Sequence, residues 1–219
     1  TSSIPGMALD ESAFSAGTYG DLWRQMALID TEFALADLLV TPDGKDLFLT
    51  TSNPWGPESV WQSFTEPLGE RWERILTVDS DSGAVMIAMS PQYDEDRTLY
   101  VAVQNGDRIA VSHDAGSSWK WQRKSPEPLL DIVVVDENTL YAAIPGGEVM
   151  KSVNHARSWS DEPADTGLGE INMLSLAADG TLFAGSTDGY VSYSRDGGES
   201  WRLIEEPVGD GAVQVLADV

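Results

Sequence analysis

Two aspartates stand at positions where a carboxylate could do chemistry. Asp37 and Asp131 each directly precede strand-forming residues, in ADLLV and LDIVV. If these strands surround a channel, the two side chains could face it, and paired carboxylates at a suitable separation hydrolyse glycosidic bonds. Each carboxylate could equally cap its own loop. We therefore treat both aspartates as candidate binding residues, with an acid pair at a channel mouth as one option.

Aromatic side chains suggest a second type of site. The segment NPWGPESVWQSF (53–64) interrupts the regular pattern of the chain and carries Trp55, Trp61 and Phe64. Aromatic rings on an insertion between strands can stack on sugars or contact partner proteins. The alternative is an ordinary long loop whose rings cover the sheet below. We predict that these three residues are candidate contacts for a protein or glycan partner.

Metal and cofactor chemistry has little support in the sequence. There is no cysteine, and His113 and His155, the two histidines, lie far apart in the chain. We therefore expect surface histidines rather than a zinc site or a catalytic triad. DSDSG (79–83) resembles the start of a calcium loop, but Ser90 stands where a bidentate acid should follow. We predict no metal site and no cofactor, with weak calcium binding by acid-rich turns left open.

The net charge limits the partners. Asp and Glu number 36 against 13 Lys and Arg, which gives a formal charge of −23. Such a surface repels phosphate, so nucleic-acid binding and docking on anionic lipid are not expected. No apolar run reaches about 18 residues, so we predict no membrane insertion. The charge leaves open simple solubility, a high-salt environment, cation binding or a position on a cell surface.

A tryptophan recurs after a turn-like stretch at similar intervals along the chain. Four octets carry this repeat: TEPLGERW (65–72), SHDAGSSW (112–119), SVNHARSW (152–159) and SRDGGESW (194–201). Ahead of the octets lie short runs rich in Val, Ile, Leu, Tyr and Phe, such as RTLYVAV and GTLFAGS, bounded by Asp, Gly, Asn or Pro. These runs predict strands joined by tight turns, with four strands in each repeat of about 40 to 47 residues.

Four antiparallel strands per repeat predict an all-β fold, a β-propeller of four-stranded antiparallel blades. We treat 1–219 as a single β-propeller domain, with blades at 34–80, 81–128, 129–168 and 169–208. AVQVLADV (212–219) is typical of a first strand, and LWRQMALI (22–29) resembles the WRLIEE of the last repeat. We therefore predict five blades, with the closing blade built from 209–219 and 1–33. The alternative is part of a larger propeller in a longer protein.

The octets resemble the Asp-box, or BNR repeat, S-x-D-x-G-x-[ST]-W, of sialidase-, sortilin- and xyloglucanase-like propellers. Two octets carry its principal residues: Ser112, Asp114, Gly116 and Trp119, and then Ser194, Asp196, Gly198 and Trp201. The octet between them keeps Ser152 and Trp159 but has Asn154 in place of the acid. The resemblance implies a structural role at the blade edge, away from the binding face. The Arg-Ile-Pro motif typical of sialidases does not occur in the sequence.

An intact fold signature beside no recognisable catalytic set favours a non-enzymatic acidic propeller. We expect an extracellular or cell-surface binding or structural module, as part of a longer chain or alone. The alternative is a carbohydrate-active enzyme, a glycoside hydrolase with paired acids at the channel mouth. A second alternative is a photosystem II assembly-type propeller, which has the same repeat. Resemblance to that group implies a basic patch, and the charge of −23 counts against it.

Overall fold

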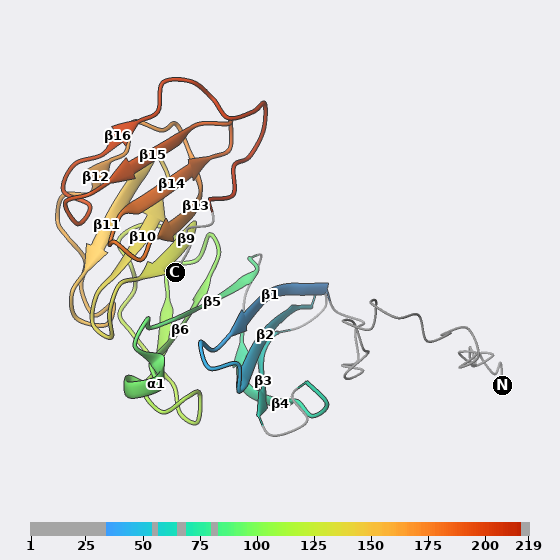
Figure 1. The fold of residues 1–219 in the computed structure, drawn as a ribbon. Helices are drawn as coiled ribbons and strands as arrows, with labels where there is room; N and C mark the ends of the chain where they lie inside the picture. Colours follow the sequence, from blue (N-terminus) through green and yellow to red (C-terminus); the bar gives the residue numbers. More distant parts are fainter. Residues whose placement is uncertain (1–33, 54–56, 65–68, 80–82, 216–219) are drawn as a thin grey trace, which may run out of the picture.

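The computed structural model describes residues 34–53, 57–64, 69–79 and 83–215. These residues form four four-stranded antiparallel sheets, each built from strands that follow one another in the chain (Figure 1). A single turn of helix, α1 (Tyr93–Asp96), is the only helix in the described part of the chain. The prediction of an all-β propeller of four-stranded antiparallel blades is therefore confirmed. Five-blade closure stays a prediction, because 1–33 and 216–219 lie outside the described residues.

We number the blades in chain order. Blade 1 contains β1 (Ala34–Val40), β2 (Asp46–Ser52), β3 (Glu58–Phe64) and β4 (Glu73–Val78). Blade 2 contains β5 (Val85–Met89), β6 (Leu99–Val103), β7 (Ile109–Ser112) and β8 (Lys120–Trp121). Blade 3 contains β9 (Asp131–Val134), β10 (Leu140–Ile144), β11 (Glu148–Ser152) and β12 (Ala164–Asp165). Blade 4 contains β13 (Ile171–Leu176), β14 (Leu182–Ser186), β15 (Val191–Ser194) and β16 (Arg202–Leu203).

The first strand of each blade lies on the inside of the arrangement. β1, β5, β9 and β13 are neighbours in that order, and each blade continues outward through its second, third and fourth strands. Blades 1 to 4 therefore follow one another along an arc, with blades 1 and 4 at its ends (Figure 1).

Antiparallel pairing sorts the turns onto two ends of the propeller. The hairpins between second and third strands and the crossovers between blades lie where the inner strands begin, which we call the crossover end. The octets join third strands to fourth strands at the opposite end, which we call the octet end. Neighbouring turns are bonded there: Ala115 N donates to Arg97 O at 3.0 Å, and His155 N donates to Asn138 O at 2.9 Å.

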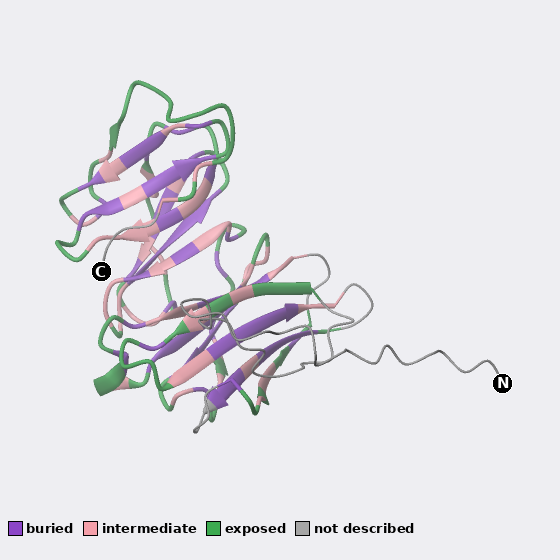
Figure 2. Ribbon diagram, turned by 45° about the vertical axis from the view of Figure 1, so that its right-hand side comes forward, coloured by how far each residue is buried: buried purple, intermediate pink, exposed green. Residues whose placement is uncertain are grey.

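Apolar side chains fill the seams between neighbouring blades. On β10, Leu140, Ala142 and Ile144 pack in the core shared with blade 2, whereas Tyr141 and Ala143 pack in the core shared with blade 4. Figure 2 shows that buried residues run along the middle strands, while the turns are exposed. Because both faces of a middle blade are apolar, stacking is what removes them from water, and this burial stabilises the fold.

The octet turns occupy equivalent places in blades 2, 3 and 4. Trp119, Trp159 and Trp201 each pack against the core that their own blade shares with the preceding blade. The three indoles are thus related by the repeat of the blades, as a propeller requires.

The residues ahead of each tryptophan hold the turn by a shared set of bonds. In blade 2, Ser112 Oγ donates to Asp114 Oδ1 at 2.8 Å and accepts from Gly116 N at 2.8 Å. Asp114 also accepts from the backbone and the hydroxyl of Ser118, at 2.8 and 2.6 Å. The same bonds recur in blade 4 among Ser194, Asp196, Gly198 and Ser200. The carboxylate therefore satisfies donors within its own turn.

The 53–64 segment, expected to be an insertion between strands, is a strand over 58–64, and 54–56 lie outside the described residues. Residues 58–64 form β3, which pairs with β2 on one side and β4 on the other. Its residues do not alternate strictly between apolar and polar, because the pairing with β4 shifts register between Val60 and Trp61. The two prolines, Pro54 and Pro57, precede the strand and do not interrupt it.

Candidate functional site

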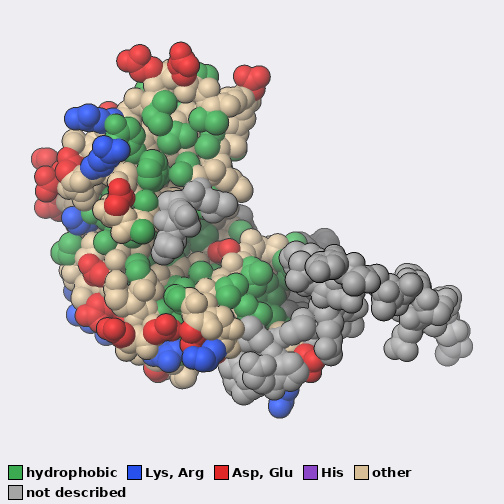
Figure 3. Space-filling view, in the orientation of Figure 1, with side chains coloured by type: hydrophobic (Ala, Val, Ile, Leu, Met, Phe, Trp, Pro, Cys, Tyr) green, Lys and Arg blue, Asp and Glu red, His purple; other side chains and the backbone are tan. Residues whose placement is uncertain are grey.

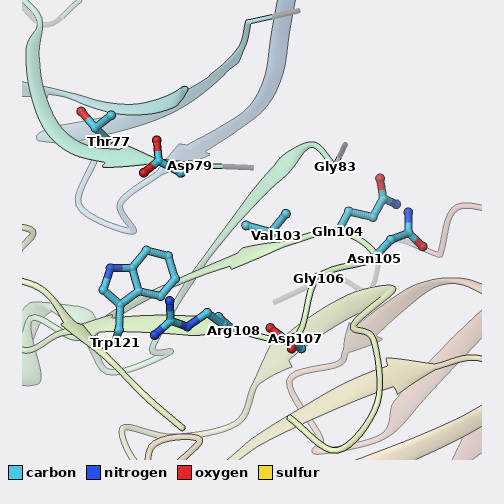
Figure 4. A pocket seen from close by; sticks show the side chains of 10 residues that line it. All are labelled: Thr77, Asp79, Gly83, Val103, Gln104, Asn105, Gly106, Asp107, Arg108 and Trp121. Carbon is cyan, nitrogen blue, oxygen red and sulfur yellow. The ribbon is translucent and has the colours of Figure 1, made fainter. Parts of the chain in front are cut away.

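A cavity of about 470 Å³ opens at the crossover end, in the seam between blades 1 and 2. We call it the seam pocket. One wall is the end of blade 1, with Thr77 and Asp79, and the other is the β6–β7 hairpin together with Trp121 of β8 (Figure 4). The hairpin contributes a run of polar groups to this wall: Gln104, Asn105, Gly106, Asp107 and Arg108.

The hairpin that forms this wall is held in place by the crossover to blade 3. Asn105 adopts a left-handed backbone conformation, with φ of 61°. Its N–H donates to Leu129 O at 2.7 Å, and Leu129 N donates to Gly106 O at 2.8 Å. Asparagine tolerates this conformation better than most residues, so the tight turn follows from the local sequence. The polar side chains of the pocket are therefore carried by an anchored turn.

Asp107, Arg108 and Trp121 of the seam pocket are each paired within the protein. The Arg108 guanidinium lies 5.5 Å from the centroid of the Trp121 ring, a cation–π arrangement. Asp107 Oδ2 lies 2.5 Å from Lys124 Nζ. The pocket thus presents amides, two acids, one cation and one indole, which suits hydrogen bonding and stacking with a polar segment rather than proton transfer.

The seam between blades 3 and 4 has a corresponding cavity of about 400 Å³. Leu203 occupies the position of Trp121 in the repeat, and Asp188, Tyr190 and Glu205 are among the other lining residues. This second cavity has two acids and no cation in its lining. The two cavities lie at corresponding places in the repeat but differ in their lining, since only the seam pocket includes a cation and an indole.

Asp37 and Asp131 both join neighbouring inner strands. Asp37 Oδ2 accepts from Ile87 N of β5 at 3.3 Å, and Asp131 Oδ2 accepts from Leu174 N of β13 at 2.7 Å. Burial raises the pKa of Asp131 to about 6, and the negative charge of Asp37 adds to the rise, while bonds from Leu174 N and Ile132 N oppose it. Each carboxylate bonds a backbone N–H of the next inner strand, so the geometry favours a structural role over an acid pair for hydrolysis. Their binding role stays a prediction.

The predicted aromatic contacts do not gather at the seam pocket. Trp61 lies in the middle of β3, where its Nε1 donates to Thr51 Oγ1 at 3.1 Å and Arg74 lies 4.7 Å from its ring centroid. Trp55 lies outside the described residues, and Phe64 is the last residue of β3. A binding role for these residues remains a prediction, and only Trp61 has a described environment.

The two histidines meet, which the sequence did not reveal. His113 and His155 come from the octet turns of blades 2 and 3, and their rings lie 4.6 Å apart, edge to face. Burial, and then the neighbouring His155, lower the pKa of His113. The repeat could have predicted this contact, since both histidines lie in the octets of successive blades. No group of three or more potential metal-binding side chains occurs in the described residues. The calcium prediction at 79–83 stays open because 80–82 lie outside them.

Fold and site together place the protein in the class of β-propellers with four-stranded blades, here with polar cavities along the seams between blades. In the described part of the chain, no helix has the length and apolar character needed to cross a membrane. No protein-family model matches the chain.

Two curated proteins are similar in sequence, both photosystem II assembly lipoproteins named Ycf48. The protein from Synechococcus sp. (strain CC9902) is 27% identical over 197 residues, covering 87% of this chain and 55% of the relative. The protein from Parasynechococcus marenigrum (strain WH8102) is 29% identical over 148 residues, covering 65% of this chain and 42% of the relative. The chain thus spans about half the length of the curated relatives it matches.

Solved structures support the fold. YCF48 from Cyanidioschyzon merolae superposes with a TM-score of 0.60 at 20% identity, covering 83% of this chain and 58% of that chain. A chain of a nidogen/laminin complex superposes with a TM-score of 0.60 at 16% identity, covering 79% and 65%. At these identities the likeness extends to the fold alone.

The expectation of an extracellular or cell-surface protein is contradicted by the curated relatives. Their names describe lipoproteins of photosystem II assembly. The acidic surface led to the wrong location because net charge reports on solubility and association, and it does not specify a compartment.

Proposed function

We propose that this chain is the protein-binding propeller of an assembly factor, acting in the assembly of photosystem II or a comparable multi-subunit complex. The observation that carries the proposal is sequence similarity to two photosystem II assembly lipoproteins, one of them over 87% of the chain. The Asp-box-type character of the octets is consistent with this group. Of the functions considered from sequence, this was the second alternative.

The seam pocket is the surface we assign to the partner. Its volume suits a few residues of a polypeptide segment, and its hairpin supplies the side-chain amides of Gln104 and Asn105. Trp121 offers an aromatic surface of the kind enriched at the centres of protein interfaces. A polar loop or chain terminus of a complex subunit is the partner that this chemistry fits.

The charge distribution limits the nature of the contact. Figure 3 shows small groups of Lys and Arg side chains beside Asp and Glu, and no continuous basic surface on the face in view. The basic patch that resemblance to the photosystem II group implies is thus not seen on that face. We therefore propose recognition through hydrogen bonds and stacking in the seam pocket, with little dependence on salt.

Binding to purified cyanobacterial photosystem II assembly complexes tests the proposal. The immobilised chain should bind the complexes, and Trp121→Ala should weaken binding by about tenfold or more, since a central aromatic contributes above about 1.4 kcal/mol. Leu203→Ala, at the corresponding position of blade 4, is the matched control and should bind like the parent chain. Thermal melts monitored by circular dichroism confirm that both variants are folded.

Two results would contradict this proposal. Absence of binding by the folded parent chain at about 10 μM overturns the assembly function, since most specific interfaces are tighter. Equal weakening by Trp121→Ala and Leu203→Ala overturns the assignment of the seam pocket as the contact.

A further inference from the structure

The seam between blades 2 and 3 carries a histidine pair at the octet end. His113 is the second residue of the blade 2 octet, and His155 is the fourth residue of the blade 3 octet. Their ring centroids lie 4.6 Å apart across the seam. In the next seam the same two octet positions are occupied by Val153 and Gly197. The pair is therefore a property of one seam, and the repeat does not require it.

The ring of His155 is oriented by its Nδ1 atom. This nitrogen lies 2.7 Å from Glu137 O, and a carbonyl oxygen can only accept, so Nδ1 carries the proton and donates. The Tyr100 oxygen lies 3.4 Å from the same nitrogen, while its own hydroxyl donates to Glu137 O. In the neutral imidazole, Nε2 then carries no proton and offers a lone pair.

The ring of His113 is oriented in the same manner by a buried hydroxyl. Its Nδ1 lies 3.1 Å from Thr98 Oγ1. The Thr98 hydroxyl donates to Asp96 O at 3.3 Å, so its oxygen accepts from the Nδ1–H of His113. Burial, and then the neighbouring His155, lower the pKa of His113, so its imidazole is neutral at pH 7. Its Nε2 is therefore a second unprotonated nitrogen in the same seam.

Two neutral imidazoles whose Nδ1–H groups are held by oxygen atoms form the arrangement usual for metal-binding histidines. Among the described residues, the hydrogen bonds of both rings use Nδ1 and leave Nε2 free. His113 is exposed and His155 is partly exposed, so an ion can reach both rings. Glu137 and Asp96 place two negative charges near His113, against the single positive charge of Arg157. The surroundings therefore favour a cation.

We propose that His113 and His155 together bind a divalent late transition-metal ion through their Nε2 atoms, with Cu²⁺ bound most tightly. Imidazole suits copper, nickel and zinc, and copper forms the most stable complexes of the three. Two nitrogens that bind one ion at about 2.0–2.1 Å lie about 3 Å apart. Rings with centroids 4.6 Å apart reach this separation by rotation of the side chains, without movement of the blades.

The ion joins the octet turn of blade 2 to the octet turn of blade 3. Because it has two protein ligands, its other positions are open to water. The proposal does not depend on the proposed function, since the histidines lie at the octet end and the seam pocket lies at the crossover end.

Copper binding to the chain at pH 7 tests the proposal. Isothermal titration with Cu²⁺ should give one tight site per chain, and pulsed electron paramagnetic resonance at half an equivalent should count two imidazoles on the ion. His113→Asn and His155→Asn each remove Nε2 but keep an N–H in the place of Nδ1, and asparagine tolerates the left-handed conformation at 155. Each variant should bind Cu²⁺ about tenfold or more weakly and show one imidazole.

Thermal stability gives a second readout. An ion that binds only the folded chain should raise the Tm by about 5 °C or more at a hundredfold excess over its Kd. The chain with both substitutions is the matched control, because it keeps the acidic surface, which binds divalent ions weakly, and lacks both Nε2 atoms. Its Tm should be unaffected by the same copper concentration. Circular dichroism establishes that all the variants are folded.

Three results would overturn this proposal. The first is a count of one imidazole in the parent chain, which needs no variant and so does not depend on the folding of any. The second is equal affinity for Cu²⁺ in the parent chain and in the chain with both substitutions. The third is a dimer in sedimentation analysis on addition of copper, which would assign the two imidazoles to different copies of the chain.

Discussion

The octet turns of blades 3 and 4 perform the same task with different residues. Blade 4 has glycines at the two left-handed positions, Gly197 and Gly198, with φ of 73° and 80°. Blade 3 has His155 and Ala156 there, with φ of 58° and 59°. Both turns keep the serine that bonds the backbone N–H four residues on, at 2.9 Å in blade 4 and 3.0 Å in blade 3.

The difference shows that the turn tolerates side chains only where the neighbouring blade leaves space. A Cβ on Gly198 would lie 2.7 Å from Tyr141 Cε1, which is closer than real Cβ contacts. Ala156 is buried in the core between blades 2 and 3 and packs there without a glycine. The octet consensus is thus enforced by the packing of the preceding blade as much as by backbone conformation.

The largest expected effect comes from transferring the blade 3 residue to blade 4. Gly198→Ala should lower the free energy of unfolding by about 2 to 5 kcal/mol, because left-handed strain adds to a clash with the Tyr141 ring. Gly180→Ala is the matched control, since its φ is 83° and a Cβ there meets nothing within 4 Å. Urea denaturation measures both variants. Equal losses in the two would show that the preceding blade imposes no constraint.

A second contrast concerns Asp131, whose carboxylate links blade 3 to Leu174 N of blade 4. The folded pKa of Asp131, about 6, lies above that of an unfolded aspartate, about 3.9, so the protonated form favours the fold. The resulting stability is full below pH 4 and is lost as the pH rises through 6. Relative to Asp131→Asn, which keeps an acceptor for Leu174 N, the parent chain should lose on the order of 2 kcal/mol between pH 4 and pH 7. Denaturation curves at the two pH values measure this, and a constant gap would contradict it.

A smaller effect is expected when the blade 2 octet is given the asparagine of blade 3. Bonds from Ser118 and Ser112 lower the pKa of Asp114, so its contribution is present above pH 4 and is lost as the pH falls through the folded pKa. Asp114→Asn should cost about 0.5 kcal/mol at pH 7, because the turn is exposed and solvent weakens the charge. The cost should vanish in acid, which is the opposite trend to Asp131. Thermal melts at pH 7 and pH 3 distinguish the two trends.

The smallest effect is expected for the reverse exchange in blade 3. Ala156→Gly should change stability by less than about 0.5 kcal/mol, because relief of left-handed strain opposes the loss of a buried methyl group. A gain above about 1 kcal/mol would mean that strain alone governs the turn. The comparison with Gly198→Ala then separates conformational strain from packing.

Much of the fold could be predicted from local pattern. Short apolar runs between turn residues indicated the strands, and the recurring tryptophans indicated the blades that contain β5 to β16. The 53–64 segment was predicted to be an insertion because prolines and tryptophans together are typical of a loop. In the structure Trp61 lies in β3 and pairs with β2. Leu49 and Arg74, which face Trp61 across the sheet, lie in other strands and give no local signal.

The candidate site was less predictable than the fold. Trp121 follows an octet tryptophan and reads as an ordinary outer-strand residue, and nothing near it in sequence points to Asp79. The two histidines were not expected to meet, because 41 residues separate them in the chain. Asp131, expected just ahead of an inner strand, is the first residue of β9, and its partner, Leu174 N, belongs to the next blade.

By itself the sequence determined that this chain is a repeat of small antiparallel sheets, because alternation along a strand and glycine in tight turns act within a few residues. Only the tertiary structure decided what lies across each seam. Trp121 and Asp79 line the same pocket, Tyr141 lies against Gly198, and His113 packs against His155. Neighbouring blades carry nearly the same pattern about one repeat apart, so many pairings satisfy the pattern equally. The stagger and packing of whole sheets select among them, and these are properties of the assembled propeller.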